Sequence, residues 1–575
     1  MALARQLALS LVALVACTAN PTTPDPEPMK KKFGPQTPPV RTEPAPELKK
    51  VEPVAPVDNG EFIVAGNLAR GRGSEQTATP PVRRVQYAKP VKKWATKVGK
   101  TTFRTTMAHV DGLIVIGTHG ATLEGKNEAT DGVYLLDAKT GAETKRIATP
   151  GSGDRDVGGI AVDGGTVYFT TDNGQIVAAT LAGKVVWTAE ATGKVRPAPA
   201  LADLDGDGAI DVVVGDESAT LRALHGATGK PLWTVKTGEN EYDARGFIAA
   251  AAIADLDADG HDDVVAAARD GILTAYRGKS GEVLWQHMGN SGVHASPTVA
   301  DFDLDGAPEV LAAWAYGDLS IHDGKTGAVR WGTVLTQDGA GIEGLFGTPT
   351  PLPGKPGVLV APTSWWEAED GVILVGVDAR SFRSFENRVS SSAVVLDLDN
   401  DGRLEAILGT EKGALLAFTA EGGRAELAKF SGGIEAPALI ADVDLDGKQE
   451  LLVASNDGML TCLSTESTGK PWLSRFRGDS PHNRGDLGKT ALGWRTGQTG
   501  GDPTPKPGTG IRVDYLRCCQ DLVDEATRAP APDNSKLLQA AAKCNSLAAI
   551  AMERSGALTS IAETAAGAEL PSSCR

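Results

Sequence analysis

A short acidic motif, repeated five times, constrains the fold of this chain more than any other feature. Each copy reads Asp-x-Asp-x-Asp-Gly-x-x-Asp/Glu and leads into an apolar run. The copies begin at Asp203, Asp255, Asp301, Asp397 and Asp442, so successive starts lie 52, 46, 96 and 45 residues apart. Because 96 is two units of 48, the spacing indicates a repeat of about 45 to 50 residues in which one copy has lost its motif.

The sequence around each motif shows what one repeat contains. An apolar run precedes the acidic loop, a second run follows it, and a short turn leads to a segment that ends in Trp, as in 228–233, 279–285 and 325–331. Short apolar runs separated by Gly and Asp turns are typical of β-strands. Four strands in a repeat of this length match one blade of a β-propeller.

Repeats without the acidic loop complete the count. Shorter turns take its place at Asp111, at Asp163 and within 348–360. We therefore predict an all-β fold over residues 86–490, a β-propeller of eight blades, with seven blades as the alternative. Trp94 lies in a spare strand before the first full repeat, and this strand could complete the last blade and close the ring. Closure protects the sheet edges that an open stack would expose.

Each acidic loop has the ligand pattern of a calcium site. Alternate carboxylates can face one centre, and Gly at the sixth position permits the sharp turn that this requires. An EF-hand would need Glu at position 12, where the first loop has Val214 in a β-branched strand. Hard carboxylate oxygens favour Ca²⁺ over transition metals. The sequence predicts about five structural calcium ions, and metal-free polar turns are the alternative.

The predicted calcium ligands are four acidic residues per loop. They are Asp203, Asp205, Asp207 and Asp211; Asp255, Asp257, Asp259 and Asp263; Asp301, Asp303, Asp305 and Glu309; Asp397, Asp399, Asp401 and Glu405; and Asp442, Asp444, Asp446 and Glu450.

Two elements of the repeat resemble known families. The run Leu-Leu-Asp-Ala-Lys-Thr-Gly at 135–141 and the Gly-x-x-Trp segments look like quinoprotein-type (PQQ-like) propeller repeats. The acidic loops look like FG-GAP/VCBS repeats, as in the integrin α-chain head. Together these resemblances cover about residues 90–490 and imply a propeller with calcium in its loops. The segment 472–479 resembles the terminal strand of many bacterial FG-GAP proteins.

The first residues read as an export signal. Residues 1–16 combine the positive Arg5 with an apolar run that is too short to span a bilayer. The tetrapeptide Leu-Val-Ala-Cys at 14–17 resembles the lipobox of bacterial lipoproteins, which implies cleavage before Cys17 and acylation of its thiol and new amine. An ordinary signal peptide is the alternative. Residues 17–85 are rich in Pro, Lys, Glu and Thr and predict a disordered tether.

The C-terminal part differs in composition from the repeats. Residues 491–510 read as a linker, and residues 511–575 as a small helical segment with four of the six cysteines, Cys518, Cys519, Cys544 and Cys574. This crowding predicts two disulfides with three possible pairings. Adjacent cysteines also occur as a vicinal disulfide in quinoprotein alcohol dehydrogenases, where they lie beside the cofactor in the propeller, whereas this pair follows the linker.

A binding surface is expected at one mouth of the central channel. A strand of each repeat begins at this mouth, seven positions before the first residue of the acidic loop or before the corresponding turn position 111, 163 or 353. The residues at these eight positions are Arg104, Asp156, Arg196, Ile248, His294, Phe346, Ser390 and Glu435. This set contains no catalytic triad and no metal cluster. Irregular aromatic residues on a regular scaffold add to the candidate surface, although they could instead pack between blades. The candidates are Arg104, Arg196, Arg245, His294, Trp314, Trp365, Trp366 and Glu435.

Charge and domain plan narrow the function. A formal net charge of −16 argues against nucleic acid as a partner. The plan resembles the propeller lipoprotein of the outer-membrane β-barrel assembly machine, which normally lacks acidic loops and a Cys-rich tail. The Arg-Gly-Asp at 477–479 reads like an integrin ligand, but composition alone explains it. Thr18, in place of the Asp that favours inner-membrane retention in enteric bacteria, favours the outer membrane, at its periplasmic face or at the cell surface.

We therefore expect a non-enzymatic, calcium-stabilised propeller that is lipid-anchored in the bacterial cell envelope. It would serve as a binding or assembly scaffold or as an adhesion module, with envelope protein or polysaccharide as partner. A calcium-dependent polysaccharide lyase is the first alternative, since some lyases use an eight-bladed propeller. A quinoprotein dehydrogenase is the second.

Overall fold

The computed structural model describes residues 64–65, 83–122, 128–236, 246–289, 291–337, 340–341, 344–354, 357–364, 371–376, 381–386, 388–478 and 480–489. Contacts divide the chain into residues 1–60 and 61–575, and all described residues belong to the second unit. Several predictions lie outside the described residues: the signal peptide, the lipidated Cys17, nearly all of the tether, the linker 491–510, and the helical segment with its four cysteines. No helix within the described ranges is long and apolar enough to cross a membrane.

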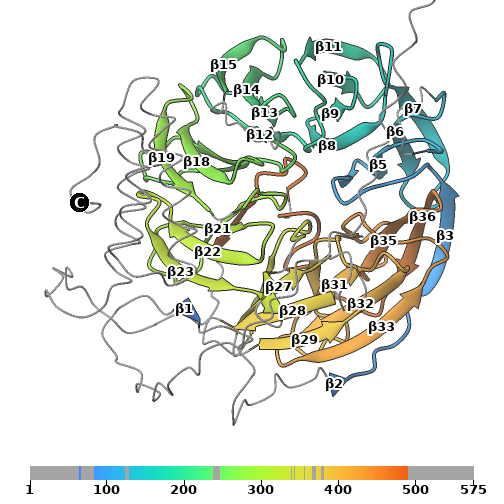
Figure 1. Ribbon diagram of the computed structural model, residues 1–575. Coiled ribbons are helices and arrows are strands. Elements are labelled where there is room, and N and C mark those ends of the chain that lie inside the picture. The colour runs from blue at the N-terminus through green and yellow to red at the C-terminus, as the bar shows by residue number, and fades with distance from the viewer. Residues whose placement is uncertain are drawn as a thin grey trace, which may run out of the picture. The chain divides into compact units, whose positions relative to one another are not determined.

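The described residues form eight blades, each an antiparallel unit of four strands, arranged in a ring around a central channel (Figure 1). In two blades, β1 (Val64–Ala65), β37 (Asp486–Lys489) and β2 (Arg83–Arg84) add parallel strands to this unit. The first four blades, innermost strand first, are β4–β7 (Met107–Val110, Leu113–Thr118, Gly132–Asp137, Glu143–Ala148), β8–β11 (Val157–Asp163, Thr166–Thr171, Gln175–Thr180, Val185–Glu190), β12–β15 (Ala200–Ala202, Asp211–Gly215, Thr220–His225, Pro231–Lys236) and β16–β19 (Ala252–Ala254, Asp263–Ala267, Ile272–Arg277, Val283–Met288).

The other blades are β20–β23 (Thr298–Asp301, Glu309–Ala313, Asp318–Asp323, Val329–Val334), β26–β29 (Thr350–Leu352, Val358–Pro362, Gly371–Gly376, Ser381–Phe385), β30–β33 (Val394–Leu396, Glu405–Gly409, Ala414–Thr419, Gly423–Lys429) and β34–β36 with β3 (Leu439–Ala441, Glu450–Ser455, Met459–Ser464, Val91–Lys97). Short strands β1 (Val64–Ala65) and β2 (Arg83–Arg84) pair with β23 and β33, and β24 (Thr336–Gln337) pairs with β25 (Ala340–Gly341). The prediction of eight blades is confirmed.

The eighth blade joins the two ends of the repeat region. Its outermost strand is β3, which pairs antiparallel with β36, so that Trp94 lies opposite Cys462. Figure 1 shows β3 beside β36, although the two strands are far apart in sequence. The predicted closure of the ring by the strand of Trp94 is therefore confirmed. It covers the edge of β36, which would otherwise expose unpaired backbone groups.

Tryptophan side chains fasten four of the described blades to the next one. The indole nitrogens of Trp187, Trp233 and Trp285 donate hydrogen bonds to the carbonyl oxygens of residues 226, 278 and 324 in the following blade, at 2.6, 2.6 and 2.7 Å. Trp94 makes the corresponding contact across the closure, to the carbonyl of residue 138 at 3.2 Å. The Trp that ends each of these repeats thus lies in its own blade and caps a turn of its neighbour.

Apolar packing between blades forms the core. Most residues of the second and third strands are buried on both faces, as in β13 and β21. One buried cluster combines Val213 and Leu221 of the third blade with Ile253 and Val264 of the fourth. Each blade shares such a cluster with its neighbour, so the ring is held by burial of apolar area as well as by hydrogen bonds.

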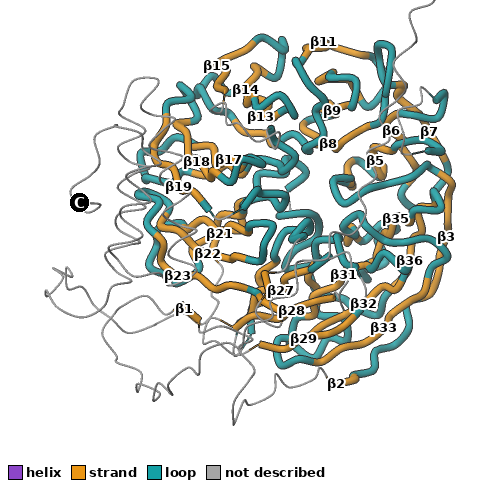
Figure 2. The backbone as a smooth tube through the Cα atoms, in the orientation of Figure 1, coloured by secondary structure: helices purple, strands orange, loops and turns teal. Residues whose placement is uncertain are grey.

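The segment after the last blade crosses the channel. We call residues 472–478 and 480–489, including β37 (Asp486–Lys489), the channel segment. The innermost strands of six blades each donate a backbone amide hydrogen bond to a carbonyl oxygen of the channel segment, at 2.7–3.0 Å. In the order of blades 7, 8, 2, 3, 4 and 5, the pairs are Val395 to Leu473, Ile440 to Ser474, Val162 to Pro481, Leu201 to His482, Ile253 to Arg484 and Val299 to Gly485. Figure 2 shows loop segments running through the middle of the ring.

This corrects the expectation of a terminal strand at 472–479. Those described residues do not complete a blade, because β3 already occupies the open edge of blade 8. The position of the channel segment also argues against an integrin-binding role for the Arg-Gly-Asp at 477–479. Arg477 is only 3% exposed, and its guanidinium donates to the carbonyl oxygens of Pro297, Ala251 and Asn483 at 2.8, 2.9 and 3.0 Å.

Candidate functional site

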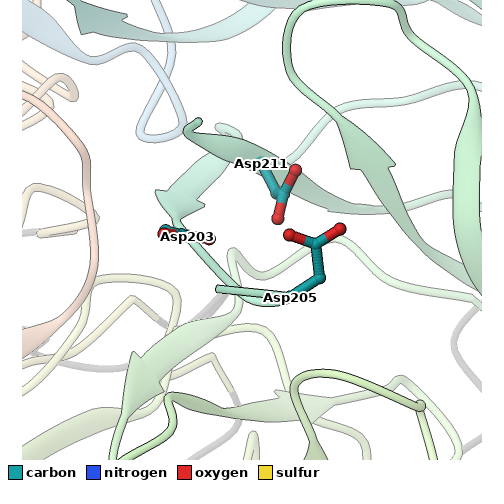
Figure 3. Close-up of side chains that lie close together, drawn as sticks. All are labelled: Asp203, Asp205 and Asp211. Atoms are coloured by element: carbon teal, nitrogen blue, oxygen red, sulfur yellow. The ribbon is translucent and has the colours of Figure 1, made fainter. Parts of the chain in front are cut away.

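The acidic loops join the innermost strand of a blade to its second strand. In blade 3, β12 ends at Ala202 and β13 begins with the buried Asp211, so the loop carries its ligands from one strand to the next. Figure 3 shows that the carboxylates of Asp203, Asp205 and Asp211 point toward one another. A cation at this position would link two strands of one blade.

In every loop, three acidic side chains bring one oxygen each to within 4.8 Å of the others. The groups are Asp203, Asp205 and Asp211; Asp255, Asp257 and Asp259; Asp301, Asp303 and Glu309; Asp397, Asp399 and Glu405; and Asp442, Asp444 and Glu450.

One predicted ligand per loop lies outside its group. In the second loop it is Asp263, and in the others it is the fifth-position residue, Asp207, Asp305, Asp401 or Asp446. Asp207, for example, contacts Nε2 of His225 at 3.0 Å.

The loop backbone is shaped by its own carboxylates. Asp203 accepts hydrogen bonds from the amides of Gly206 and Gly208 at 2.8 and 2.9 Å. The fourth position has a left-handed φ in every loop, and in four loops it is not glycine, as at Ala258 with φ 61° and Asn400 with φ 60°. Such a conformation costs about 1 kcal/mol or more and persists only when its surroundings impose it.

The buried carboxylates lack sufficient hydrogen-bond donors. Burial raises the pKa of Glu309 to about 8 and that of Asp211 to about 6, with neighbouring carboxylates adding to both effects. Among the described residues, one buried carboxylate oxygen has no hydrogen-bond partner in four loops, on Asp211, Asp257, Asp301 and Asp444. Unsatisfied, hard, convergent oxygens are the donor set that Ca²⁺ takes. The residues present therefore fit a calcium ion.

Four of the eight predicted channel-mouth residues line one depression. Arg104, Ile248, His294 and Phe346 surround it, and Phe476 of the channel segment adds to its wall. It encloses about 280 Å³, part of which is open to solvent. The sequence prediction had placed these residues together because each directly precedes an innermost strand.

Aromatic rings from three blades meet over the channel at this depression. The ring of Phe346 lies 4.7 Å from that of His294 and 5.5 Å from that of Phe103. The guanidinium of Arg104 lies 4.5 Å from the centre of the Phe103 ring. Burial, together with the charges of Arg269 and Arg104, lowers the pKa of His294 to about 4. The mouth is therefore apolar at its centre, with cationic groups around it.

The remaining surface candidates have different surroundings. Arg196 lies 3.3 Å from Asp172 and 3.2 Å from Glu217, and Glu435 accepts a hydrogen bond from Asn456. Arg245, Trp365 and Trp366 lie outside the described residues.

Trp314 corrects the prediction of a surface role. It is only 1% exposed, its indole donates to the carbonyl of Gly271 at 2.9 Å, and its ring lies 5.6 Å from that of His287. It packs between blades 4 and 5, as the alternative reading of the aromatics had stated.

Sequence reasoning missed Arg269 and Phe103 at the mouth. The Nε atoms of Arg104 and Arg269 are buried and have no hydrogen-bond partner among the described residues. Phe103 directly precedes Arg104, so a prediction that included the neighbours of each selected residue would have contained it. Arg269 lies in the turn between the second and third strands of blade 4, a position that the search did not sample.

Comparison with known proteins agrees with this architecture. Residues 129–334 match the family PQQ_2, described as outer membrane protein assembly factor BamB, so this stretch carries PQQ-like repeats. No curated protein matches the chain.

Similar solved structures include BamB from Moraxella catarrhalis, with 14% identity over 65% of this chain and 99% of that one and a TM-score of 0.46. A europium-containing methanol dehydrogenase has 13% identity over 63% and 84% of the two chains and a TM-score of 0.46. Quinohemoprotein alcohol dehydrogenase from Comamonas testosteroni has 15% identity over 68% and 79%, with a TM-score of 0.44.

Proposed function

We propose that this chain is a calcium-stabilised β-propeller that serves as a binding or assembly scaffold in the bacterial cell envelope, anchored through a lipid on Cys17. The observation that carries the proposal is that the middle of the ring is filled. The channel segment bonds to six blades, and the rings of Phe103, His294 and Phe346 meet over the mouth. Partners then bind to the faces of the ring and not inside it.

The calcium ions have a structural role in this proposal. Each loop gathers carboxylates between the first and second strands of a blade. In the loops of blades 3, 4 and 5 a buried oxygen, on Asp211, Asp257 and Asp301, has no hydrogen-bond donor among the described residues. Without a cation these charges repel one another at short range. A ligand that binds only the folded state stabilises it by mass action.

The channel mouth is the proposed contact surface for a protein partner. The guanidinium of Arg104 lies against Phe103 at the depression that Phe346 also lines, and the charges of Arg104 and Arg269 both act on His294 there. Arg and aromatic side chains at a recessed centre are typical of residues that dominate binding energy. The family description of residues 129–334 as an outer membrane assembly factor supports an envelope setting.

Contacts at the channel mouth argue against the quinoprotein alternative. A planar cofactor at this mouth would have to separate the ring of Phe346 from the rings of His294 and Phe103. The lyase alternative is tested by incubating the protein with pectic polysaccharide and recording the absorbance of unsaturated uronate. Turnover would overturn the scaffold proposal.

Thermal unfolding tests the calcium role. We expect the Tm of the purified chain to fall by several degrees in excess EGTA and to return when calcium is added back. A ligand at 100 times its Kd adds about 2.7 kcal/mol. Magnesium at the same concentration is the control. An unchanged melting curve in EGTA would contradict structural calcium.

Capture from intact cells tests the scaffold role. The chain carrying a C-terminal affinity tag is crosslinked in its source bacterium, and the partners are identified with wild type and with the double variant Arg104→Glu, Arg269→Glu. Loss of the same envelope protein from the variant sample, with retention in the rim variant Lys184→Glu, is the expected result. Identical partners in all three samples would place binding elsewhere.

A further inference from the structure

The acidic loop of blade 8 differs from the other four because a lysine reaches its carboxylates. The Nζ atom of Lys93, on the closing strand β3, lies 2.6 Å from Oδ2 of Asp444 and 2.9 Å from Oε1 of Glu450. Both residues belong to the three-carboxylate group of this loop, together with Asp442. The side chain of Lys93 is 25% exposed and that of Glu450 is 0% exposed, so the ammonium reaches the innermost ligand.

Basic residues near the other loops do not reach the innermost ligand. Arg277 lies 3.4 Å from Asp257 and 3.2 Å from Asp259, two members of the blade-4 group, but it is an arginine whose side chain is 43% exposed, and its ion pairs do not include the buried Asp263. His225 and Arg403 pair with the fifth-position residues, which lie outside the carboxylate groups of their loops.

A β-bulge aims Lys93 at the loop. In the pairing of β3 with β36, Lys92 lies opposite Leu463 and Trp94 opposite Cys462, so Lys93 is the extra residue. Bulges redirect a side chain in this way. The same bulge occurs in the outer strands of blades 3, 4 and 5, where the extra residue is Leu232, Leu284 and Arg330.

The residues at the equivalent bulges do not place an ammonium among the carboxylates of their loops. Leucine cannot compete for a carboxylate, and the guanidinium of Arg330 pairs with Asp323, which is not a loop residue. Only blade 8, among the blades with described acidic loops, combines an acidic loop with a lysine at this position.

We propose that the ammonium of Lys93 occupies the cation position of the blade-8 loop, so that four loops exchange calcium and the fifth binds the closing strand directly. The proposal rests on the calcium role proposed above. An ammonium held by two carboxylates, with one of them fully buried, links β3 to the loop between β34 and β35. Ring closure then includes one cation that belongs to the chain itself and that chelators cannot remove.

Calcium stoichiometry tests this proposal. The full chain is equilibrated with calcium, and bound metal is counted by equilibrium dialysis with elemental analysis. We expect the variant Lys93→Met to bind one ion more than wild type, and the neighbouring control Lys92→Met to match wild type. The transfer variant Leu232→Lys, which puts a lysine at the bulge of blade 3, should bind one ion fewer.

The outcomes separate this proposal from the one on which it rests. Equal counts for wild type and Lys93→Met, with far-ultraviolet circular dichroism showing both folded, would overturn the role of Lys93 and leave structural calcium intact. A wild type that binds no calcium would overturn the calcium role itself. If Lys93→Met does not fold, the transfer variant decides, since an unchanged count for a folded Leu232→Lys would contradict the proposal.

Discussion

At the scale of single residues, one histidine is fully buried with both ring nitrogens in hydrogen bonds. His322 on β22 is 0% exposed, with Nδ1 3.0 Å from the carbonyl of Gly327 and Nε2 2.7 Å from the hydroxyl of Ser320. Its ring stacks on Trp285, and His287 lies 4.4 Å away between ring centres. Nδ1 therefore donates and Nε2 accepts, which is the pattern of a neutral ring.

We predict that stability declines in acid because of this residue. Burial, with the nearby His287, lowers the pKa of His322 well below its usual 6.5. The unfolded chain therefore binds the proton first, and stability is lost as the pH falls below 6.5 toward the folded-state pKa. One residue contributes at most ~1.4 kcal/mol per pH unit.

The measurement is Tm at pH 7.5 and 5.5 in saturating calcium. The variant His322→Gln should melt lower at pH 7.5 because it loses packing, but its Tm should fall less between the two pH values than that of wild type. His261→Gln, at an exposed position, should keep the wild-type difference. An equal fall in His322→Gln would exclude this histidine as the source.

At the scale of the structural element, the Thr-Gly or Ser-Gly turn of one blade and the tryptophan of the preceding blade form one joint. A Cβ atom on Gly281 would lie 2.8 Å from the Trp233 ring, and its φ of +72° disfavours any side chain. The turn of one blade thus needs glycine so that the indole of the preceding blade can lie flat against it. This explains why Gly and Trp recur together in the repeat.

We predict that both halves of this joint are needed. Trp233→Phe removes the donor to the buried carbonyl of residue 278 and should cost about 1–3 kcal/mol. Gly281→Ala should cost a similar ~1–3 kcal/mol through strain and contact with the ring. Urea unfolding measures both. Gly469→Ala is the matched control, since nothing lies within 4 Å of its added Cβ and its φ is not left-handed, and no loss is expected.

The channel segment depends on a few side chains that satisfy carbonyls at the centre of the ring. Asn483 is 2% exposed, and its amide nitrogen donates to the carbonyls of Ile160 and Pro199 at 2.6 and 3.2 Å. Its φ is 53°, which Asn tolerates better than Ala. Asn483→Ala should therefore lower the free energy of unfolding by about 2–4 kcal/mol. Ser480→Ala, nearby in the segment, should cost much less in the same urea titration, and equal losses would argue against this role.

At the scale of the whole molecule, closure rests on β3. We predict that a variant lacking residues 18–90 stays monomeric, because β3 remains on β36. A variant lacking residues 18–98 exposes the edge of β36 and should self-associate, because an open edge pairs with other chains. Light scattering after size-exclusion chromatography measures the mass of each. If both variants are monomeric, closure by β3 is not required to protect the edge of β36.

The sequence allowed the ring and the acidic loops to be predicted because their signals are local. Ligands such as Asp203 and Asp211 lie within one loop, and the repeat length fixed the blade. The channel segment was missed because it pairs mainly with backbone groups, which have no side-chain pattern. Lys93 was missed because a bulge, invisible in the sequence, sets its direction. Trp314 was misplaced because the repeat fixes its position along the chain but not its burial.

The channel segment also fixes an order of events during synthesis. Its six partner blades include the second and the eighth, so it can take its place only after nearly all of the ring exists. β3, made at the start of the ring, likewise waits for β36. A chain that emerges N-terminus first therefore presents an open, unsealed ring until residue 489 has been made. The period during which the ring is open therefore ends when the last strand is made and not when the first one is.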